Sequence, residues 1–188
     1  MKNLLLLAIS MVTINMAVAQ TVAGSVTLPN TVNFGNTDLQ LNGAGIRKKA
    51  MVLKLYSGGL YLTTKSDNAE SIINSDKSMA IKLVITSSFV SSEAMSEAVL
   101  EGFEASTNGK TAALNADIKK FISFFSDEIV EEDMFDITYQ SGTGAVVYKN
   151  GKELGTISGM DFKKALFGIW LGNDPADRKL KIGMLGKK

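Results

Sequence analysis

Hydrophobic positions alternate with polar ones through the first third of the chain beyond residue 20, which is the pattern of half-buried β-strands. Within the run MVLKLY, Met51, Leu53 and Leu55 share one face while Lys54 points to the other. Gly58 and Gly59 follow, and they predict a bulge or bend that interrupts this strand. Strands are predicted at residues 25–28, 32–34, 38–47, 50–56 and 60–62, with 38–47 and 50–56 as antiparallel neighbours.

The middle of the chain is helical apart from one alternating segment, residues 79–85, which predicts a strand. A short helix is predicted at 67–73, with Asp67 as its N-cap. A longer helix begins after Ser91 or Ser92 and stops near Asn108, and a second spans 112–125. Their apolar stripes are Met95, Ala98, Val99, Gly102 and Phe103 in the first, and Leu114, Ile118, Phe121, Ile122 and Phe125 in the second.

The last third returns to strands at 134–140 and 145–148 before a final helix. Asn150-Gly151 predicts a tight hairpin, because both residues tolerate the positive φ of a type I′ turn. Ser158 and Asp161 predict a capping box for the final helix, which Gly172 ends. Its apolar stripe is Phe162, Ala165, Leu166, Ile169 and Trp170. Strands and helices clustered in this way predict an α+β domain, with helices on one face of an antiparallel sheet.

Residues 1–19 have the pattern of a cleaved secretory signal peptide. Lys2 gives a positive start, residues 4–9 form an apolar centre, and residues 17–19 (Ala-Val-Ala) fit the small-x-small cleavage rule. A membrane anchor is the alternative, but the apolar stretch is shorter than the roughly 20 residues that a span needs. We therefore expect a single domain over residues 20–188 that is periplasmic or secreted in a bacterium, without a stable membrane anchor after cleavage.

The composition of the chain excludes several kinds of partner, metal site and catalytic group. Without Lys2 the chain has 19 basic and 19 acidic residues, which argues against a nucleic-acid partner and gives no general attraction to anionic lipid. The absence of cysteine and histidine excludes the usual zinc, copper and haem sites and the Cys- or His-based triads. No metal or other cofactor is expected. The acidic run at 127–133 lacks the ligand spacing of an EF-hand, and a solvated face is expected there.

Two segments carry a resemblance to a known family. They are LNGAGIRKKAMVLKLYSGGLYL, residues 41–62, and ALFGIWLGNDPAD, residues 165–177. The first resembles the GAGIR element and the following strand of the chalcone-isomerase-like family, in particular its short bacterial branch. The second resembles that family's late helix and proline-containing turn. The resemblance implies an open sandwich of a large curved antiparallel sheet and a helical layer, with a ligand cleft between them.

Arg47 is the principal candidate for a functional residue. It lies at the end of a predicted strand, where a buried guanidinium would need an anionic partner. From the residues alone, a solvated turn of Arg47, Lys48 and Lys49 is the favoured interpretation, and the family resemblance reverses it. The family resemblance implies more for Arg47. In chalcone isomerases the matching arginine stabilises the phenolate that attacks the enone, and in related fatty-acid-binding members it holds the lipid carboxylate.

Tyr56 could donate a hydrogen bond to the same ligand oxygen, or it could be an interfacial tyrosine with a packed ring. The resemblance places Met95 and Gly102 where chalcone isomerases carry a Tyr and an Asn. Neither side chain can donate a hydrogen bond to a developing negative charge. Met95, Val99 and Phe103 could instead form an apolar wall, together with Phe121 and Phe124 or Phe125, although each also fits an ordinary core.

Three functions remain open at this point. The first is a non-catalytic binding protein for a small hydrophobic molecule with a carboxylate, such as a fatty acid, at a ligand site of Arg47, Tyr56, Met95, Val99 and Phe103. The second is an enzyme, an intramolecular lyase (isomerase) of the chalcone isomerase type, in which Arg47 stabilises the oxyanion and Tyr56 assists. The third is a structural or interaction protein whose cleft is filled by its own side chains. The sequence does not indicate an oligomeric state.

Overall fold

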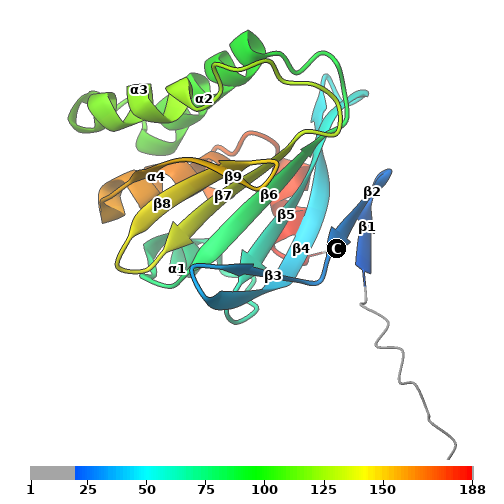
Figure 1. Cartoon of the computed structure of the whole chain (residues 1–188), viewed down its shortest axis with the longest axis horizontal. Helices are drawn as coiled ribbons and strands as arrows, with labels where there is room; N and C mark the ends of the chain where they lie inside the picture. Colours follow the sequence, from blue (N-terminus) through cyan, green and yellow to red (C-terminus); the bar gives the residue numbers. More distant parts are fainter. Residues whose placement is uncertain (1–19, 188) are drawn as a thin grey trace, which may run out of the picture.

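Seven consecutive strands form one antiparallel sheet in which each strand pairs with the next one along the chain. A computed structural model describes residues 20–187, so the predicted signal peptide lies outside the described residues. Figure 1 shows the sheet curving beneath the helices. Its strands are β3 (Thr31–Phe34), β4 (Thr37–Lys49), β5 (Leu53–Leu62), β6 (Met79–Ile85), β7 (Met134–Gln140), β8 (Gly144–Lys149) and β9 (Lys152–Ile157).

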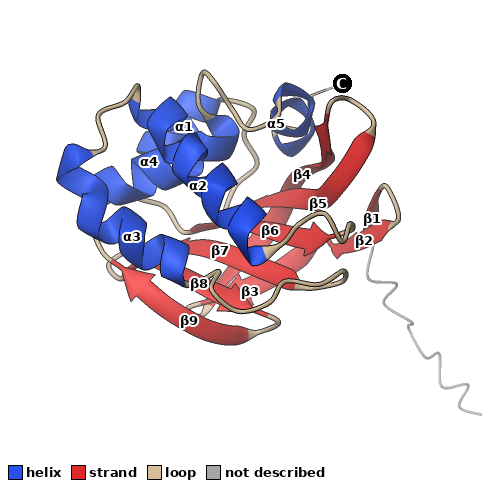
Figure 2. Cartoon of the chain, turned by 90° about the horizontal axis from the view of Figure 1, so that it is seen from above, coloured by secondary structure: helices blue, strands red, loops and turns tan. Residues whose placement is uncertain are grey.

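The helices lie together on one face of this sheet, as Figure 2 shows. They are α1 (Ala69–Asn74) between β5 and β6; α2 (Ser92–Thr107), the short 3₁₀ helix η1 (Ala112–Leu114) and α3 (Asn115–Ser123) between β6 and β7; and α4 (Met160–Leu171) and α5 (Arg178–Met184) after β9. The predicted α+β class, with an antiparallel sheet covered on one face by helices, is confirmed. No helix in the described part of the chain is long and apolar enough to cross a membrane.

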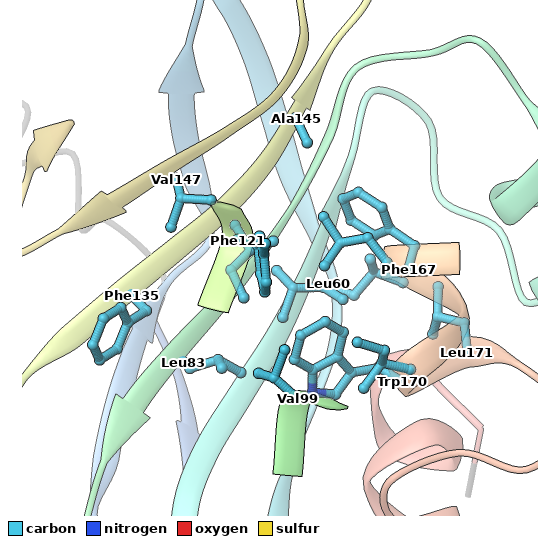
Figure 3. Packing of buried hydrophobic residues seen from close by; sticks show 14 of the residues in the cluster. Leu60, Leu83, Val99, Phe121, Phe135, Ala145, Val147, Phe167, Trp170 and Leu171 are labelled. Atoms are coloured by element: carbon cyan, nitrogen blue, oxygen red, sulfur yellow. The ribbon is translucent and has the colours of Figure 1, made fainter. Parts of the chain in front are cut away.

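Helix α4 is the centre of the helical layer. Nine of its 12 residues are buried, because it packs against α1, α2 and the sheet at once. Figure 3 shows its Phe167, Trp170 and Leu171 in one cluster with Leu60 of β5 and Val99 of α2. Even Lys163 of α4 is fully buried, and its ammonium donates to the carbonyls of Ile72, Ile73 and Ser75 at the end of α1.

A second, smaller core lies on the opposite face of the sheet. There the separate hairpin of β1 (Gln20–Ala23) and β2 (Val26–Pro29) covers part of β4 and β5. The Tyr61 hydroxyl donates to the Pro29 carbonyl at 2.9 Å, and the Ser57 hydroxyl donates to the Ala23 carbonyl at 2.8 Å. These bonds fix the hairpin to β5, so the sheet is covered on both faces at this end.

Strand β5 runs without a break from Leu53 to Leu62, so the predicted interruption at Gly58 and Gly59 is wrong. Because these glycines have no side chain, residues of α5 and of β2 can pack closely against the two faces of the strand. A Cβ at Gly58 would lie 2.8 Å from the Met184 side chain of α5, and one at Gly59 would lie 2.9 Å from Leu28 of β2. The chain turns at Ala50 and Met51, which the prediction had placed within the strand.

Helix α5 was not predicted, and its docking explains two further glycines. Gly43 and Gly45 of β4 face α5, and a Cβ at Gly43 would lie only 2.2 Å from the backbone carbonyl of Gly183. The helix therefore packs backbone against backbone on the strand. Asp177 caps it by accepting hydrogen bonds from the backbone amides of Lys179 and Leu180.

Most other predicted boundaries hold, with a few corrections. Ser91 caps α2 and Asn108 ends it, and the Asn150-Gly151 hairpin has the expected positive φ at both residues. The cap of α1 is Asn68 rather than Asp67. The predicted Ser158–Asp161 capping box does not form, because Gly159 is the N-cap of α4 and no side chain caps it. The predicted helix 112–125 divides into η1 and α3.

Candidate functional site

Arg47 lies near the end of β4 on the face of the sheet that carries the helices. It pairs with Tyr56 of β5, and the register shifts immediately afterwards, so that Lys48 pairs with Lys54. The shift leaves Leu55 without a partner on β4, which is a β-bulge. Consecutive strand residues normally point to opposite faces, but because of the bulge both Leu55 and Tyr56 lie in the main core. The bulge thus sets Arg47 and Tyr56 side by side at the edge of the helical layer.

Arg47 is half-buried, and its guanidinium lies over the Tyr56 ring with 5.6 Å between its central carbon and the ring centroid. This is the geometry of a cation–π contact, which holds the guanidinium in place without neutralising its charge. Within residues 20–187, no carboxylate lies within ion-pair distance of Arg47. Its planar donor fork therefore remains available to an oxygen anion from outside the chain.

The Tyr56 side chain is only 2% exposed, and its hydroxyl accepts a hydrogen bond from the indole nitrogen of Trp170 at 3.0 Å. That bond comes from α4 and fixes the phenol ring on which Arg47 rests. Because the indole is only a donor, the phenol keeps its own proton for another acceptor. The Tyr56 ring thus supports Arg47, and its hydroxyl keeps one proton that it can donate.

Arg47 and Tyr56 line a pocket of about 440 Å³ between the β4–β5 hairpin and helix α2. Met95 lines it as well, so three of the five predicted ligand residues meet in one pocket. Its apolar wall consists of Leu53, Leu55, Phe89, Val90, Ala94, Met95, Ala98 and Ala176. Polar and charged groups share the lining with these side chains, and convergent polar groups beside an apolar wall are usual in a small-molecule site.

The rim of the pocket is charged. It carries the cations Arg47, Lys48 and Lys49 and the carboxylates of Glu97 and Glu101, an excess of one positive charge. The lysines and glutamates are exposed, whereas Arg47 is half-buried. Solvent screens the exposed charges most strongly, so the electrostatic field inside the pocket comes chiefly from the guanidinium.

Comparison with known proteins agrees with this geometry. The family model described as chalcone isomerase-like matches residues 19–186, which is nearly the whole chain. The protein belongs to the chalcone isomerase-like family. A fatty-acid binding protein of Arabidopsis thaliana has the same fold, with a TM-score of 0.71 over 89% of this chain and 96% of that one, at 18% sequence identity. No curated protein sequence matches the chain.

The GAGIR element of this chalcone isomerase-like chain has a clear physical basis. Its two glycines, Gly43 and Gly45, provide the flat surface on which α5 docks, and its arginine, Arg47, stands two residues further along the same face. Asp177 connects the two parts, because its carboxylate caps α5 and also accepts from the backbone amide of Lys48 at 3.0 Å. The motif therefore positions the pocket arginine through the helix docked beside it.

Val99 and Phe103 lie deeper than the pocket and do not line it. Val99 is 4% exposed and Phe103 is fully buried. The Phe103 ring packs against Phe121 and Phe162 with centroids 5.8 and 5.5 Å apart. Phe125 packs in turn on Phe121 and Phe135, and Phe124 is partly buried beside the core. These side chains fill the space between the helices and the sheet in this chain.

Gly102, the position at which the chalcone isomerase pattern has an asparagine, is closed by packing. A Cβ there would lie 2.7 Å from the side chain of Ile169 on α4. The close approach of α2 and α4 leaves no room for an amide side chain unless Ile169 moves. Met95, at the position of the pattern's tyrosine, lines the pocket with a thioether that cannot donate a hydrogen bond. The two donors missing from the sequence are not replaced at these positions.

Several pocket residues were not predicted from the sequence. Leu53 and Leu55 had been assigned only to a strand face, and the bulge that turns Leu55 inward has no local signal. Phe89 and Val90 lie in the loop before α2, where periodicity gives no information. Phe89 is 69% exposed, and a large apolar side chain in such a loop is a signal that could have indicated it.

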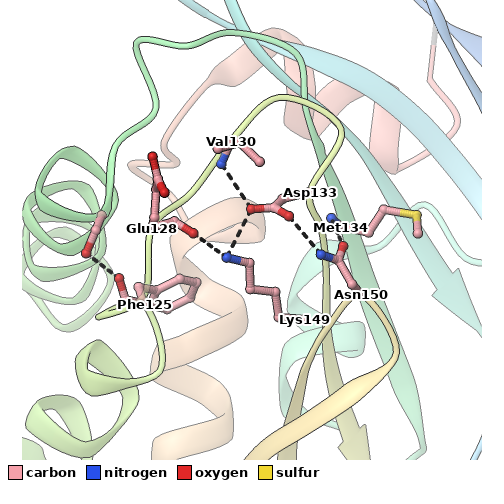
Figure 4. A network of polar contacts seen from close by, with 8 residues as sticks. Phe125, Glu128, Val130, Asp133, Met134, Lys149 and Asn150 are labelled. Atoms are coloured by element: carbon pink, nitrogen blue, oxygen red, sulfur yellow. Dashed lines mark hydrogen bonds and ion pairs between the residues drawn. The ribbon is translucent and has the colours of Figure 1, made fainter.

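The acidic run at 127–133 was expected to be a solvated face, but its last residue, Asp133, is not solvated. Asp133 is buried, accepts from the Val130 amide and Asn150, and forms an ion pair with Lys149 at 3.0 Å (Figure 4). Burial alone would raise the pKa of Asp133, but these hydrogen bonds and the lysine together lower it. Glu131 accepts from the Ser88 amide. Within the described residues, no group of three or more acidic side chains could hold a metal ion. The run fastens the loop before β7.

Proposed function

We propose that this protein binds a small amphiphile with an anionic head, such as a fatty acid, and does not act as an enzyme. The observation that carries the proposal is the guanidinium of the half-buried Arg47, held on the Tyr56 ring in a partly apolar pocket without a carboxylate partner among the described residues. An unpaired guanidinium in that position is suited to bind an anionic group. The fatty-acid binding protein that shares the fold supports the same class of ligand.

In this proposal the carboxylate of the ligand accepts two hydrogen bonds from Arg47, in the bidentate geometry that a guanidinium favours. The Tyr56 hydroxyl donates to one of the same oxygens, while Trp170 continues to donate to the phenol oxygen. The acyl chain then lies along Leu55, Val90 and Met95. Methionine adapts to the shape of a flexible chain.

The proposed absence of catalysis follows from two missing hydrogen-bond donors. A developing oxyanion on a chalcone needs several hydrogen-bond donors, and each missing donor typically costs about 3–4 kcal/mol of transition-state stabilisation. Met95 and Gly102 provide none. Arg47 and Tyr56 remain on the pocket wall to hold an anion, with the exposed Lys48 and Lys49 at the rim, which suits binding rather than ring closure.

We further propose that the protein works outside the cytoplasm, in a periplasm or as a secreted protein. The support is the sequence of residues 1–19, which has the charged start, apolar centre and small-x-small site of a cleaved signal peptide. N-terminal sequencing of the protein from a bacterial periplasmic fraction tests this. A mature N-terminus at Gln20 is expected, and retention of Met1 in the soluble cytoplasm would contradict it.

Two measurements test the binding function. Native mass spectrometry of the purified protein should show a bound lipid acid, and isothermal titration with dodecanoate should give saturable binding with one site. Arg47→Ala should weaken dodecanoate binding about tenfold to a hundredfold, since a hydrogen bond to a charged group contributes about 1.5–3 kcal/mol.

The matched control is Lys119→Ala, which removes one exposed positive charge from α3 and leaves the pocket untouched. It should bind dodecanoate as the unmodified protein does. Equal binding by the Arg47→Ala variant would refute the role of Arg47. Ring closure of a chalcone by the unmodified protein, detected by its ultraviolet spectrum and lost in Arg47→Ala, would show the lyase activity instead.

A further inference from the structure

The tip of the β4–β5 hairpin presents apolar side chains to solvent. Met51 is 80% exposed and Val52 is 81% exposed, the highest values among the large hydrophobic side chains of the described residues. They belong to the turn that connects Lys49 to Leu53, which projects beyond the sheet in Figure 1. Turn residues are normally polar, so two adjacent and fully presented apolar side chains require an explanation.

The backbone of this turn is unfavourable for the residues it contains. Ala50 has a φ of 49° and Met51 a φ of 61°, both in the left-handed region. The hairpin at Asn150 and Gly151 has similar angles, 52° and 80°, with the two residues that favour them. The same chain therefore contains one optimal turn and one that keeps apolar residues at a conformational cost, which is a pattern found at functional segments.

All charged residues in the sequence of the β4–β5 hairpin near the tip are positive. From residue 39 to residue 66 there is no Asp or Glu, while Arg47, Lys48, Lys49 and Lys54 all lie on the hairpin. On the outer side, Lys48 and Met51 line a second pocket of about 410 Å³ with Arg178 and Lys179 of α5. Although the charges of the whole chain balance, basic residues therefore surround the exposed Met51 and Val52.

Phe89 lies on the other side of the tip. It lines the ligand pocket together with Lys48, Lys49 and Ala50. Its loop is fixed by two hydrogen bonds, because the Phe89 amide donates to the Ser87 hydroxyl and the Ser88 amide donates to Glu131. These bonds hold the loop at the pocket mouth, where Phe89 is 69% exposed.

We propose that the apolar tip, defined as Met51, Val52 and Phe89, docks on the surface of a bilayer that contains anionic lipid. The three side chains enter the interfacial region, and the lysines at positions 48, 49 and 54 contact the lipid head groups. This contact is peripheral and reversible. It goes beyond the proposed ligand function, although it would place the mouth of the pocket against a lipid surface.

The acidic groups fit this orientation. Glu97 and Glu101 lie on α2 across the pocket, and Glu131 lies behind the Phe89 loop. They would be repelled by an anionic surface, so the hairpin is the part of this end that approaches most closely. Asp177 is engaged as the cap of α5 and with the Lys48 amide, so the Lys48 side chain remains free of it.

Vesicle flotation tests the proposal. The protein should float with vesicles of phosphatidylcholine mixed with phosphatidylglycerol, and much less with phosphatidylcholine alone. Raising the salt to about 1 M, where the Debye length falls to about 3 Å, should release most of it. Met51→Ser combined with Val52→Ser should lower the partition coefficient by at least about tenfold, as expected from the transfer of two apolar side chains.

Two further variants separate docking from folding. Ala50→Asn with Met51→Gly installs the favourable turn residues, so it should raise thermal stability and still weaken vesicle binding. Leu100→Ser, which removes an exposed apolar side chain of α2 away from the hairpin, should change neither. All variants are compared with the same N-terminus, verified by intact mass, so that residues 1–19 contribute equally.

The outcomes are distinct from those of ligand binding. Arg47→Met, which should weaken dodecanoate binding, should still float with anionic vesicles through the tip. Equal flotation of the Met51→Ser/Val52→Ser variant and the unmodified protein would overturn the proposal, as would a lack of preference for anionic lipid. Concentration-dependent dimerisation that this double variant abolishes, without any vesicle binding, would assign the tip to a second copy of the chain instead.

Discussion

Substitution of Gly43 by alanine tests the docking of α5 on β4, which positions the arginine of the site. The new Cβ would lie 2.2 Å from the carbonyl oxygen of Gly183 and 2.7 Å from the amide nitrogen of Gly186, so α5 must move by about 1 Å. Its anchors Leu180 and Met184 are fully buried, and Leu185 is 5% exposed. Burial of three such side chains contributes about 4–9 kcal/mol, and a gap of this size forfeits a quarter to a half of the contact. We therefore expect Gly43→Ala to lower the free energy of unfolding by about 3 kcal/mol.

Gly45→Ala is the matched control, because the same substitution two residues along the strand meets tight contacts but none as close as those at Gly43. Its Cβ would lie 3.2 Å from the Cα of Leu180 and 3.3 Å from a flexible methyl group. We expect a loss below about 1 kcal/mol. Urea denaturation followed by circular dichroism measures both variants, and amide exchange within α5 shows whether that helix is the element released. Equal stabilities of the two variants, or a larger loss at Gly45, would refute the packing argument.

Two further predictions concern buried charges. Lys163→Met should lower stability by about 2 kcal/mol at neutral pH, because the Ile73 and Ser75 carbonyls lose their donor. Burial lowers the pKa of Lys163 from 10.5 to about 8 in the folded protein, so between these pH values the unfolded chain binds this proton more tightly. The free energy of unfolding should therefore rise as the pH increases from about 8 to 10.5. Urea titrations across this pH range should show the rise in the unmodified protein and not in Lys163→Met. Asp133→Asn should destabilise the protein by about 1–3 kcal/mol at pH 7. Since the pKa of Asp133 is lowered in the folded state, that difference should shrink as the pH falls below about 4, and its persistence in acid would contradict the role given to Lys149.

Much of the fold followed from periodicity, and the exceptions have identifiable causes. Strands β6 and β7 and helix α2 have long regular patterns, and Asn150-Gly151 is a strong turn signal, so all were predicted. Helix α5 was not, since only Leu180 and Met184 mark its apolar face within a basic segment. It exists because glycines far away in the sequence allow it to dock. For the same reason Gly58 and Gly59 indicated a bend locally, whereas their role is tertiary.

The candidate site was partly accessible from the sequence. Arg47, Tyr56 and Met95 were named, and the structure brings them to one pocket. Val99 and Phe103 were named with them, but periodicity identifies only the inward face of a helix and not the depth at which a side chain stops. Periodicity could not find Phe89 or Leu55, because Phe89 lies in a loop and a register shift turns Leu55 inward; for Phe89 only the presence of a large apolar residue in that loop was a signal.

The most direct test of the central claim is a thermodynamic cycle between Arg47 and the ligand carboxylate. Titration calorimetry would compare dodecanoate with methyl dodecanoate, on the unmodified protein and on Arg47→Met, which keeps an apolar stem over the Tyr56 ring. We predict that the acid binds the unmodified protein about tenfold or more tightly than the ester, and that this preference disappears in the variant. An equal preference for the acid in both proteins, or none in either, would contradict an arginine that pairs with the anionic head of a bound amphiphile.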